Sequence, residues 1–135
     1  MAFLVAAFRG FGSRETACTA LSAAGHTVVL FGDGAPALAE ILAGRPEAVV
    51  LEDRLGRMNA DQVRAAMRAD PATAAIPVIV CAPGRRTAAS RPRLRRGGAP
   101  TVDTAQLATQ LPTAVAAALA GQRSPRSPSH SLPVA

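Results

Sequence analysis

The sequence predicts an α/β fold in which the strands of one parallel sheet alternate with helices on both of its faces. Short apolar runs recur along the chain between segments of helical periodicity, which is the pattern of repeated strand–helix–strand units. The run from Ala48 to Leu51 is apolar throughout, as expected for a central strand that is buried on both faces. Turn residues such as Gly25 and Asp33 separate these segments. One domain is expected for 135 residues.

Three strands and two helices are predicted in the first half of the chain. The apolar run at the N-terminus is broken at Gly10, and Ser13 is placed to cap the helix that follows. Gly25 ends that helix, as a glycine beyond the last turn commonly does. Pro36 fits the first turn of the second helix, where its missing N–H costs no hydrogen bond. The predicted strands run from Phe3 to Ala7, from Thr27 to Phe31 and from Ala48 to Leu51, and Arg45 with Pro46 stops the second helix.

Two further strands and two further helices are predicted in the second half. Asp70 and Pro71 end a helix that spans residues 60 to 68. Pro112 lies inside the last helix and is expected to kink or split it. The other predicted elements are a strand from Ile76 to Cys81, a short strand from Pro100 to Asp103 and a last helix from Thr104 to Ala120.

The composition changes at the C-terminus. From Gly121 onward the chain consists mainly of Arg, Ser and Pro, which cannot bury enough apolar surface to order a segment. We therefore expect one domain at residues 1–121 and a disordered tail at 122–135.

The basic side chains are all arginine, and the chain contains no lysine. Any mechanism that needs an amine side chain is therefore excluded. The net charge of +6 permits binding to nucleic acid, to anionic lipid or to an acidic protein surface.

The two cysteines and the N-terminus bear on the class of protein. Cys18 and Cys81 lack the spacing of metal ligands and are expected to be buried thiols rather than a disulfide framework. The apolar N-terminal run has no basic residue before it and is too short for a signal peptide. No apolar segment is long enough to span a bilayer, so a cytoplasmic protein is expected.

Three segments resemble the response-regulator receiver (CheY-like) family in their order and separation. The first is residues 24–29 followed by 33–34 and 37–38, the second is 46–51 followed by Leu55 and Met58, and the third is 70–80. The resemblance covers residues 1 to about 84 well. It implies a flavodoxin-like, doubly wound sheet of five parallel strands in the order 2-1-3-4-5. Residues 85–98 stand in the place of the family's fourth helix. Their low apolar content predicts that this helix is reduced or replaced by an arginine-rich loop.

The family accepts phosphoryl groups on an aspartate at the end of its third strand, and Glu52 stands at that position. The family pattern places apolar residues three and six positions after the acceptor, which Leu55 and Met58 satisfy for Glu52. Asp53 would put Gly56 in the first of these places, and it would become the acceptor only through a bulge in the loop.

The other positions that the family needs for this chemistry are degenerate. An acidic pair that holds Mg²⁺ would lie near Ala7 and Phe8, a hydroxyl would lie at Ala82, and the lysine cannot exist in this chain. Mg²⁺ requires several oxygen ligands, and cations must neutralise the transferring group. We expect no phosphoryl transfer, no metal site, no cofactor and no enzymatic activity.

Two interpretations of Glu52 stay open at this point. It could project a fixed negative charge where a phospho-aspartate would project one and so hold the domain in one signalling state. Alternatively, Glu52 and Asp53 are solvated carboxylates in a loop, which Arg54 or Arg57 could pair with at little gain in stability.

The arginine-rich segment also has two interpretations. It could bind nucleic acid, an acidic protein or lipid head groups, since the planar guanidinium grips phosphate and carboxylate through two hydrogen bonds. It could equally be a flexible, solvated loop, because it contains no aromatic residue on which bases could stack. Its candidate residues are Arg85, Arg86, Arg91, Arg93, Arg95 and Arg96.

The sequence therefore favours an atypical receiver, or pseudo-receiver, of bacterial signal transduction. It would not be phosphorylated, and it would act by binding a protein: a kinase, an effector or a second copy of itself as a homodimer. The alternative is a basic protein that binds nucleic acid or another polyanion through residues 85–96 and the tail, with the receiver fold as a scaffold.

Overall fold

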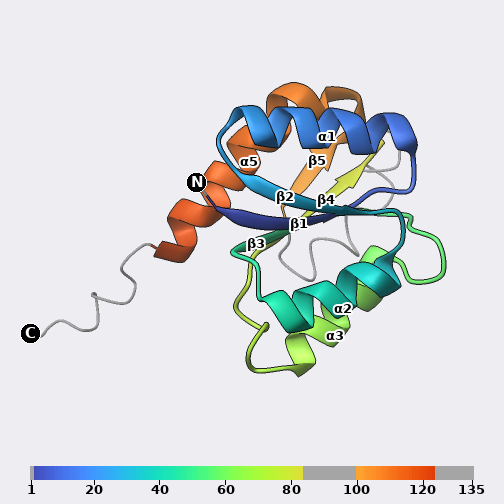
Figure 1. Ribbon diagram of the computed structural model, residues 1–135, viewed down its shortest axis with the longest axis vertical. Helices are drawn as coiled ribbons and strands as arrows, with labels where there is room; N and C mark the ends of the chain where they lie inside the picture. The colour runs from blue at the N-terminus through green and yellow to red at the C-terminus, as the bar shows by residue number, and fades with distance from the viewer. Residues whose placement is uncertain (1, 84–99, 124–135) are drawn as a thin grey trace, which may run out of the picture.

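Five parallel strands form a single sheet in the order β2-β1-β3-β4-β5 (Figure 1). The computed structural model describes residues 2–83 and 100–123. The fold class and strand order predicted from the sequence are confirmed. The elements are β1 (Phe3–Ala7), α1 (Phe11–Ala23), β2 (Thr27–Phe31), α2 (Gly34–Gly44), β3 (Ala48–Glu52), α3 (Ala60–Ala69), β4 (Val78–Ala82), β5 (Thr101–Asp103), the short 3-10 helix η1 (Thr104–Gln106) and α5 (Leu107–Arg123).

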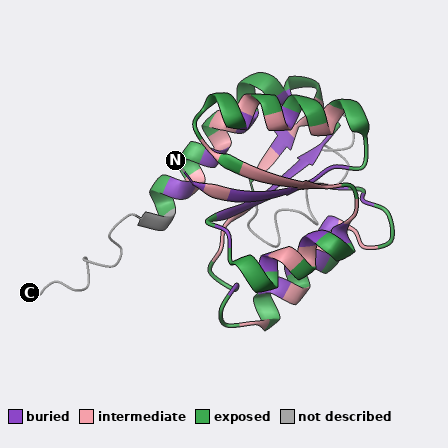
Figure 2. Cartoon of the chain, in the orientation of Figure 1, coloured by how far each residue is buried: buried purple, intermediate pink, exposed green. Residues whose placement is uncertain are grey.

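Helices cover both faces of the sheet and enclose two apolar cores. Helices α1 and α5 pack on one face, and α2 and α3 pack on the other (Figure 1). Successive residues of a strand point to opposite faces, so β3 supplies Val50 to the first core and Val49 and Leu51 to the second. Figure 2 shows the central strands buried and the outward faces of the helices exposed. Because side chains pack against both faces of β3, its last residue, Glu52, has a fixed position at the carboxyl ends of the strands.

The two ends of α1 are formed differently from each other. At its C-terminus, Gly25 has a φ of 95° and donates its N–H to Ser22, while His26 donates to Leu21. This is the Schellman arrangement that glycine permits, and it confirms the predicted stop. At its N-terminus the cap is Gly10, without a side-chain hydrogen bond. The predicted cap by Ser13 is wrong, because the helix begins two residues earlier.

Helix α5 continues through Pro112 without a break. Pro112 lies near the start of the helix and removes the hydrogen bond that would reach the carbonyl of Ala108, which is exposed and accessible to water. The predicted split is therefore wrong.

Several sequence predictions concern residues that the structure does not describe. The reduced fourth helix and all six candidate arginines between Arg85 and Arg96 lie outside the described residues, as does most of the predicted tail. Among residues 2–83 and 100–123, no helix is both long and apolar enough to cross a membrane.

Candidate functional site

A cleft of about 440 Å³ opens at the carboxyl ends of the strands. Its walls come from the segments that follow β1, β3 and β4, because parallel strands bring these segments to one edge of the sheet. The residues that line it are Arg9, Gly10, Glu52, Asp53, Arg54 and Pro83. The cleft therefore contains Glu52 and Asp53, the two carboxylates that the sequence singled out.

Glu52 is the last residue of β3, and its carboxylate is held by the backbone of a neighbouring segment. Glu52 Oε1 accepts a hydrogen bond of 2.6 Å from the backbone N–H of Arg9, which follows β1. Hydrogen bonds to an ionised acceptor are stronger than neutral ones. The side chain is half-buried, so its charge is fixed in position rather than free in solvent.

Asp53 lies deeper than Glu52. Only 4% of its surface is exposed, and its backbone N–H donates to the carbonyl of Cys81 at 2.7 Å. The alternative in which both acids are solvated is therefore wrong for Asp53. Asp53 directly follows β3, and its hydrogen bond to Cys81 extends the pairing of β3 with β4 by one residue. This pairing keeps the Asp53 side chain inside the molecule.

Ala7 and Phe8, where the resemblance places the cation-binding acids, carry no side-chain oxygen. Ala7 and Phe8 are fully buried, and the ring of Phe8 belongs to the core between the sheet and helices α1 and α5. One oxygen of Glu52 is already taken by the Arg9 N–H. Within the described part of the chain, no three His, Cys, Asp or Glu side chains come together as a metal site. The residues present do not fit the Mg²⁺ that the family uses.

The ends of β4 and β5 also differ from the family pattern. Ala82 ends β4, is buried and offers no hydroxyl. Asp103 ends β5, and its carboxylate accepts a hydrogen bond of 3.0 Å from the Ala105 N–H, which caps η1. The Asp103 carboxylate is therefore engaged as the cap of η1.

Arg54 and Arg57 are exposed on the β3–α3 loop. The sequence left open that they pair with Glu52 or Asp53, and the ion pair seen between described residues is instead Arg64 with Asp61 on α3, at 3.7 Å. The hydrogen bond from Arg9 to Glu52 was not foreseen either, and no sequence signal could have revealed it, because the donor is a backbone group.

Asp33 links the β3–α3 loop to the start of α2 through hydrogen bonds to its carboxylate. Its Oδ1 accepts a 2.6 Å hydrogen bond from Gly34. Desolvation acts to raise the pKa of Asp33, but the N–H groups of Gly34, Met58, Arg57 and Ala35 outweigh it and hold the pKa below its ordinary value. At Gly34 a Cβ would fall 2.3 Å from the Met58 carbonyl oxygen, so this contact requires glycine.

Cys81 lies on β4 opposite Glu52. Burial raises the pKa of its thiol, and the nearby Glu52 carboxylate raises this pKa further. Cys81 is therefore a neutral core residue, as expected. Cys18 on α1 is only half-buried, which corrects the expectation that both thiols are buried.

Comparison with solved structures identifies the fold. NtrX from Brucella abortus superposes with a TM-score of 0.83 at 20% identity over 96% of this chain, but this chain spans only 29% of NtrX. The receiver domain of NarL from Mycobacterium tuberculosis gives 0.76 at 27% identity over 89% of this chain and 97% of its own. The receiver domain of the Luxo repressor from Vibrio parahaemolyticus gives 0.79 at 15% identity over 90% and 92%.

No protein-family model and no curated protein matches the sequence. The structural neighbours are nevertheless response-regulator receiver domains, as the sequence resemblance predicted. The chain thus has the fold of a signal-transduction receiver domain.

Proposed function

We propose that this chain is a pseudo-receiver: a signalling domain that does not accept phosphate and acts by binding another protein. It performs no catalysis of its own. The predicted domain at residues 1–121 is kept as part of this proposal, although α5 continues two residues beyond it, to Arg123.

The proposal is supported mainly by the burial of Phe8. In the receiver pattern this position supplies an acid that holds a cation, and here Phe8 is fully buried in the core between the sheet and helices α1 and α5. A phosphoryl group approaching Glu52 would meet no cation ligand at Ala7 or Phe8, no hydroxyl at Ala82 and no lysine anywhere in the chain. Without cations, the negative charge that must be neutralised in phosphoryl transfer stays unbalanced.

The position of Glu52 supports a constant signalling state. Its carboxylate is held by the Arg9 N–H at 2.6 Å, so a single negative charge stands at the end of β3 without any modification. The charge at this position would be the same at all times. The polyanion-binding alternative depends on residues 85–96, which lie outside the described residues, and it stays a prediction.

Acetyl phosphate tests the proposal directly. The full chain, incubated with acetyl phosphate and Mg²⁺, should keep its intact mass, while a receiver domain that carries the acceptor aspartate gains a phosphoryl group in parallel. Beryllofluoride with Mg²⁺ should likewise leave the amide spectrum around Glu52 unchanged. Uptake of a phosphoryl group that disappears in Glu52→Gln would contradict the proposal.

A further inference from the structure

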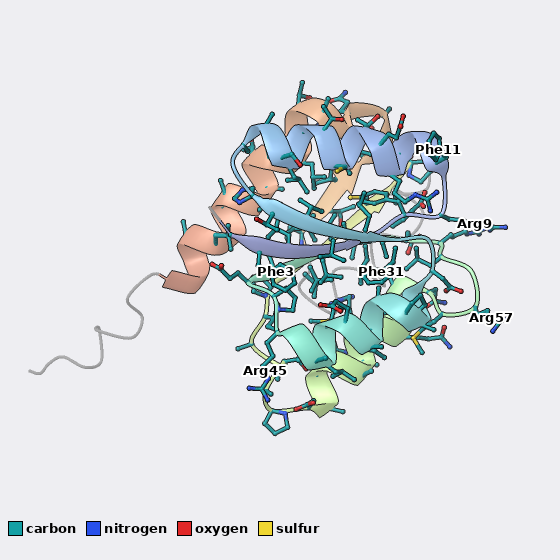
Figure 3. All side chains as sticks on the ribbon, in the orientation of Figure 1. Phe3, Arg9, Phe11, Phe31, Arg45 and Arg57 are labelled. Carbon is teal, nitrogen blue, oxygen red and sulfur yellow. The ribbon has the colours of Figure 1, made fainter. Side chains whose placement is uncertain are left out.

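Four arginines gather at the carboxyl edge of the sheet, and we call them the arginine edge: Arg9, Arg14, Arg54 and Arg57. Arg9 follows β1, and Arg54 and Arg57 follow β3; all three are exposed. Arg14, in the first turns of α1, lies against the turn after β2, since a Cβ at Gly32 would fall 2.6 Å from its Nη1. Figure 3 shows Arg9 and Arg57 projecting from the same side of the molecule.

The acids of the same region face inward or are engaged. Glu52 accepts from the Arg9 N–H, Asp53 is buried, Asp33 binds backbone N–H groups and Asp103 caps η1. Glu15, the nearest acid along α1, lines a separate groove between α1 and α5. The arginine edge has no ion pair with any described carboxylate. Its three exposed arginines therefore present their positive charge to solvent, while Arg14 Nη1 donates a 3.4 Å hydrogen bond to the Phe8 carbonyl.

An exposed aromatic ring lies beside these charges. Phe11, the first residue of α1, is 66% exposed and is the most exposed large apolar side chain in the described part of the protein. The guanidinium of Arg14 lies 5.7 Å from the centre of its ring. Arginine and aromatic side chains are enriched where proteins bind one another, and they supply much of the binding energy there.

The cleft gives this surface a concave part. Arg9 and Arg54 line it together, next to Gly10, where the N-terminus of α1 has no side-chain cap. An incoming carboxylate could be gripped by these guanidinium groups, because arginine binds carboxylates through two parallel hydrogen bonds. Phe11 is two residues from Arg9, so an apolar neighbour of that carboxylate could cover its ring.

We propose that the arginine edge and Phe11 form a docking surface for an acidic protein segment that carries an apolar side chain. This inference rests on the proposed function and names the chemistry of the partner. Nucleic acid fits the surface less well. Phe3, Phe8 and Phe31 are built into the cores, so Phe11 stands alone and no row of rings exists for stacking.

Amide spectra of the isotope-labelled full chain provide the test. The probe is a short synthetic peptide of Asp and Glu around one Leu, and the control peptide has Lys in place of the acids. Shifts should be confined to residues 9–14 and 53–57 and should be absent with the control peptide. Shifts spread over the molecule, or centred elsewhere, would overturn the proposal.

Three variants sharpen the test. Arg54→Gln and Phe11→Ala should each weaken binding at least about fivefold, the loss expected for a central interface residue. Arg45→Gln removes the same charge at the opposite end of the sheet and should change the affinity by less than about twofold. Circular dichroism checks that each variant is folded. If Arg45→Gln and Arg54→Gln lowered the affinity for the peptide equally, the overall charge of the protein would explain the binding, and the proposed docking surface would be wrong.

Two further probes separate this inference from its competitors. An oligonucleotide and inorganic phosphate are the two other probes. If either of them shifts the same amides and the peptide does not, the surface binds phosphate and the proposed acidic protein segment is wrong. Failure of the peptide in a chain that acetyl phosphate leaves unmodified overturns the docking surface alone. Phosphoryl uptake overturns the proposed function whether or not the peptide binds.

Discussion

At the residue scale, Phe8 is a buried core residue at a position where the resemblance to receivers would place a cation-binding acid. Its ring is fully buried, and its backbone N–H donates to the Phe31 carbonyl at 3.0 Å. We predict that Phe8→Ala lowers the free energy of unfolding by about 3–5 kcal/mol, through lost burial and a new cavity. The measurement is urea unfolding followed by circular dichroism, because the chain has no Trp or Tyr to report by fluorescence.

Phe11 supplies the matched control for this prediction. Because its ring is 66% exposed, Phe11→Ala should change stability by no more than about 0.5 kcal/mol. Equal losses in the two variants would show that burial does not distinguish the two rings. Phe8→Asp should be worse than Phe8→Ala, since it places an unpaired carboxylate in the core.

The two thiols should differ in reactivity for the same reason of burial. Cys81 is buried on a central strand with a raised pKa, whereas Cys18 is half-buried and has only a weak contact with Ser22. We predict that one thiol of the native protein reacts readily with a disulfide reagent and that the second reacts only on unfolding. In Cys18→Ser the rapid phase should vanish. A rapid reaction that persists in this variant would mean that β4 opens easily.

At the scale of elements, Asp33 joins α2 to the loop that follows β3. Its folded pKa is lowered by backbone N–H donors, so its carboxylate stabilises the fold above the ordinary value of 3.8. This contribution is lost as the pH falls through the folded pKa. We predict that wild type loses stability more steeply than Asp33→Asn below about pH 4.

Urea unfolding of both proteins across the acid range measures this effect. The stability difference between wild type and Asp33→Asn should be largest near neutral pH and should shrink as the acid protonates. The amides of Arg57 and Met58 should shift in the variant, because they donate to the carboxylate. A stability difference that stays constant with pH would contradict the role assigned to the ionised side chain.

At the scale of the whole molecule, the regular elements were predictable and the contacts between them were not. Apolar runs and turn residues indicated all five strands, because a parallel sheet between helices demands buried strands with polar turns. The start of α1 was missed, since Gly10 caps it without a side chain that a sequence pattern could show. The capping box of α3, formed by Asn59 and Gln62, was also overlooked, although its spacing is readable.

In the candidate site, too, the positions of residues along the chain were predictable and their contacts were not. Glu52 and Asp53 were found from their place after a buried strand. Their different environments were not, because these depend on the Arg9 N–H and on burial beside β4. The arginine edge combines loops that are far apart in sequence, and only the fold brings Arg9 beside Arg54. A search along the chain for charge runs finds residues 85–96 instead, where the charges are adjacent.

The buried ring of Phe8 also limits which single substitutions this part of the molecule can accept. A mutation that placed an acid there would exchange packed hydrocarbon for a buried, unpaired charge, and the folded population would fall. Neighbouring side chains would first have to be remodelled so that water could reach the acid. Installing a cation ligand at this position would therefore take several coordinated substitutions rather than one.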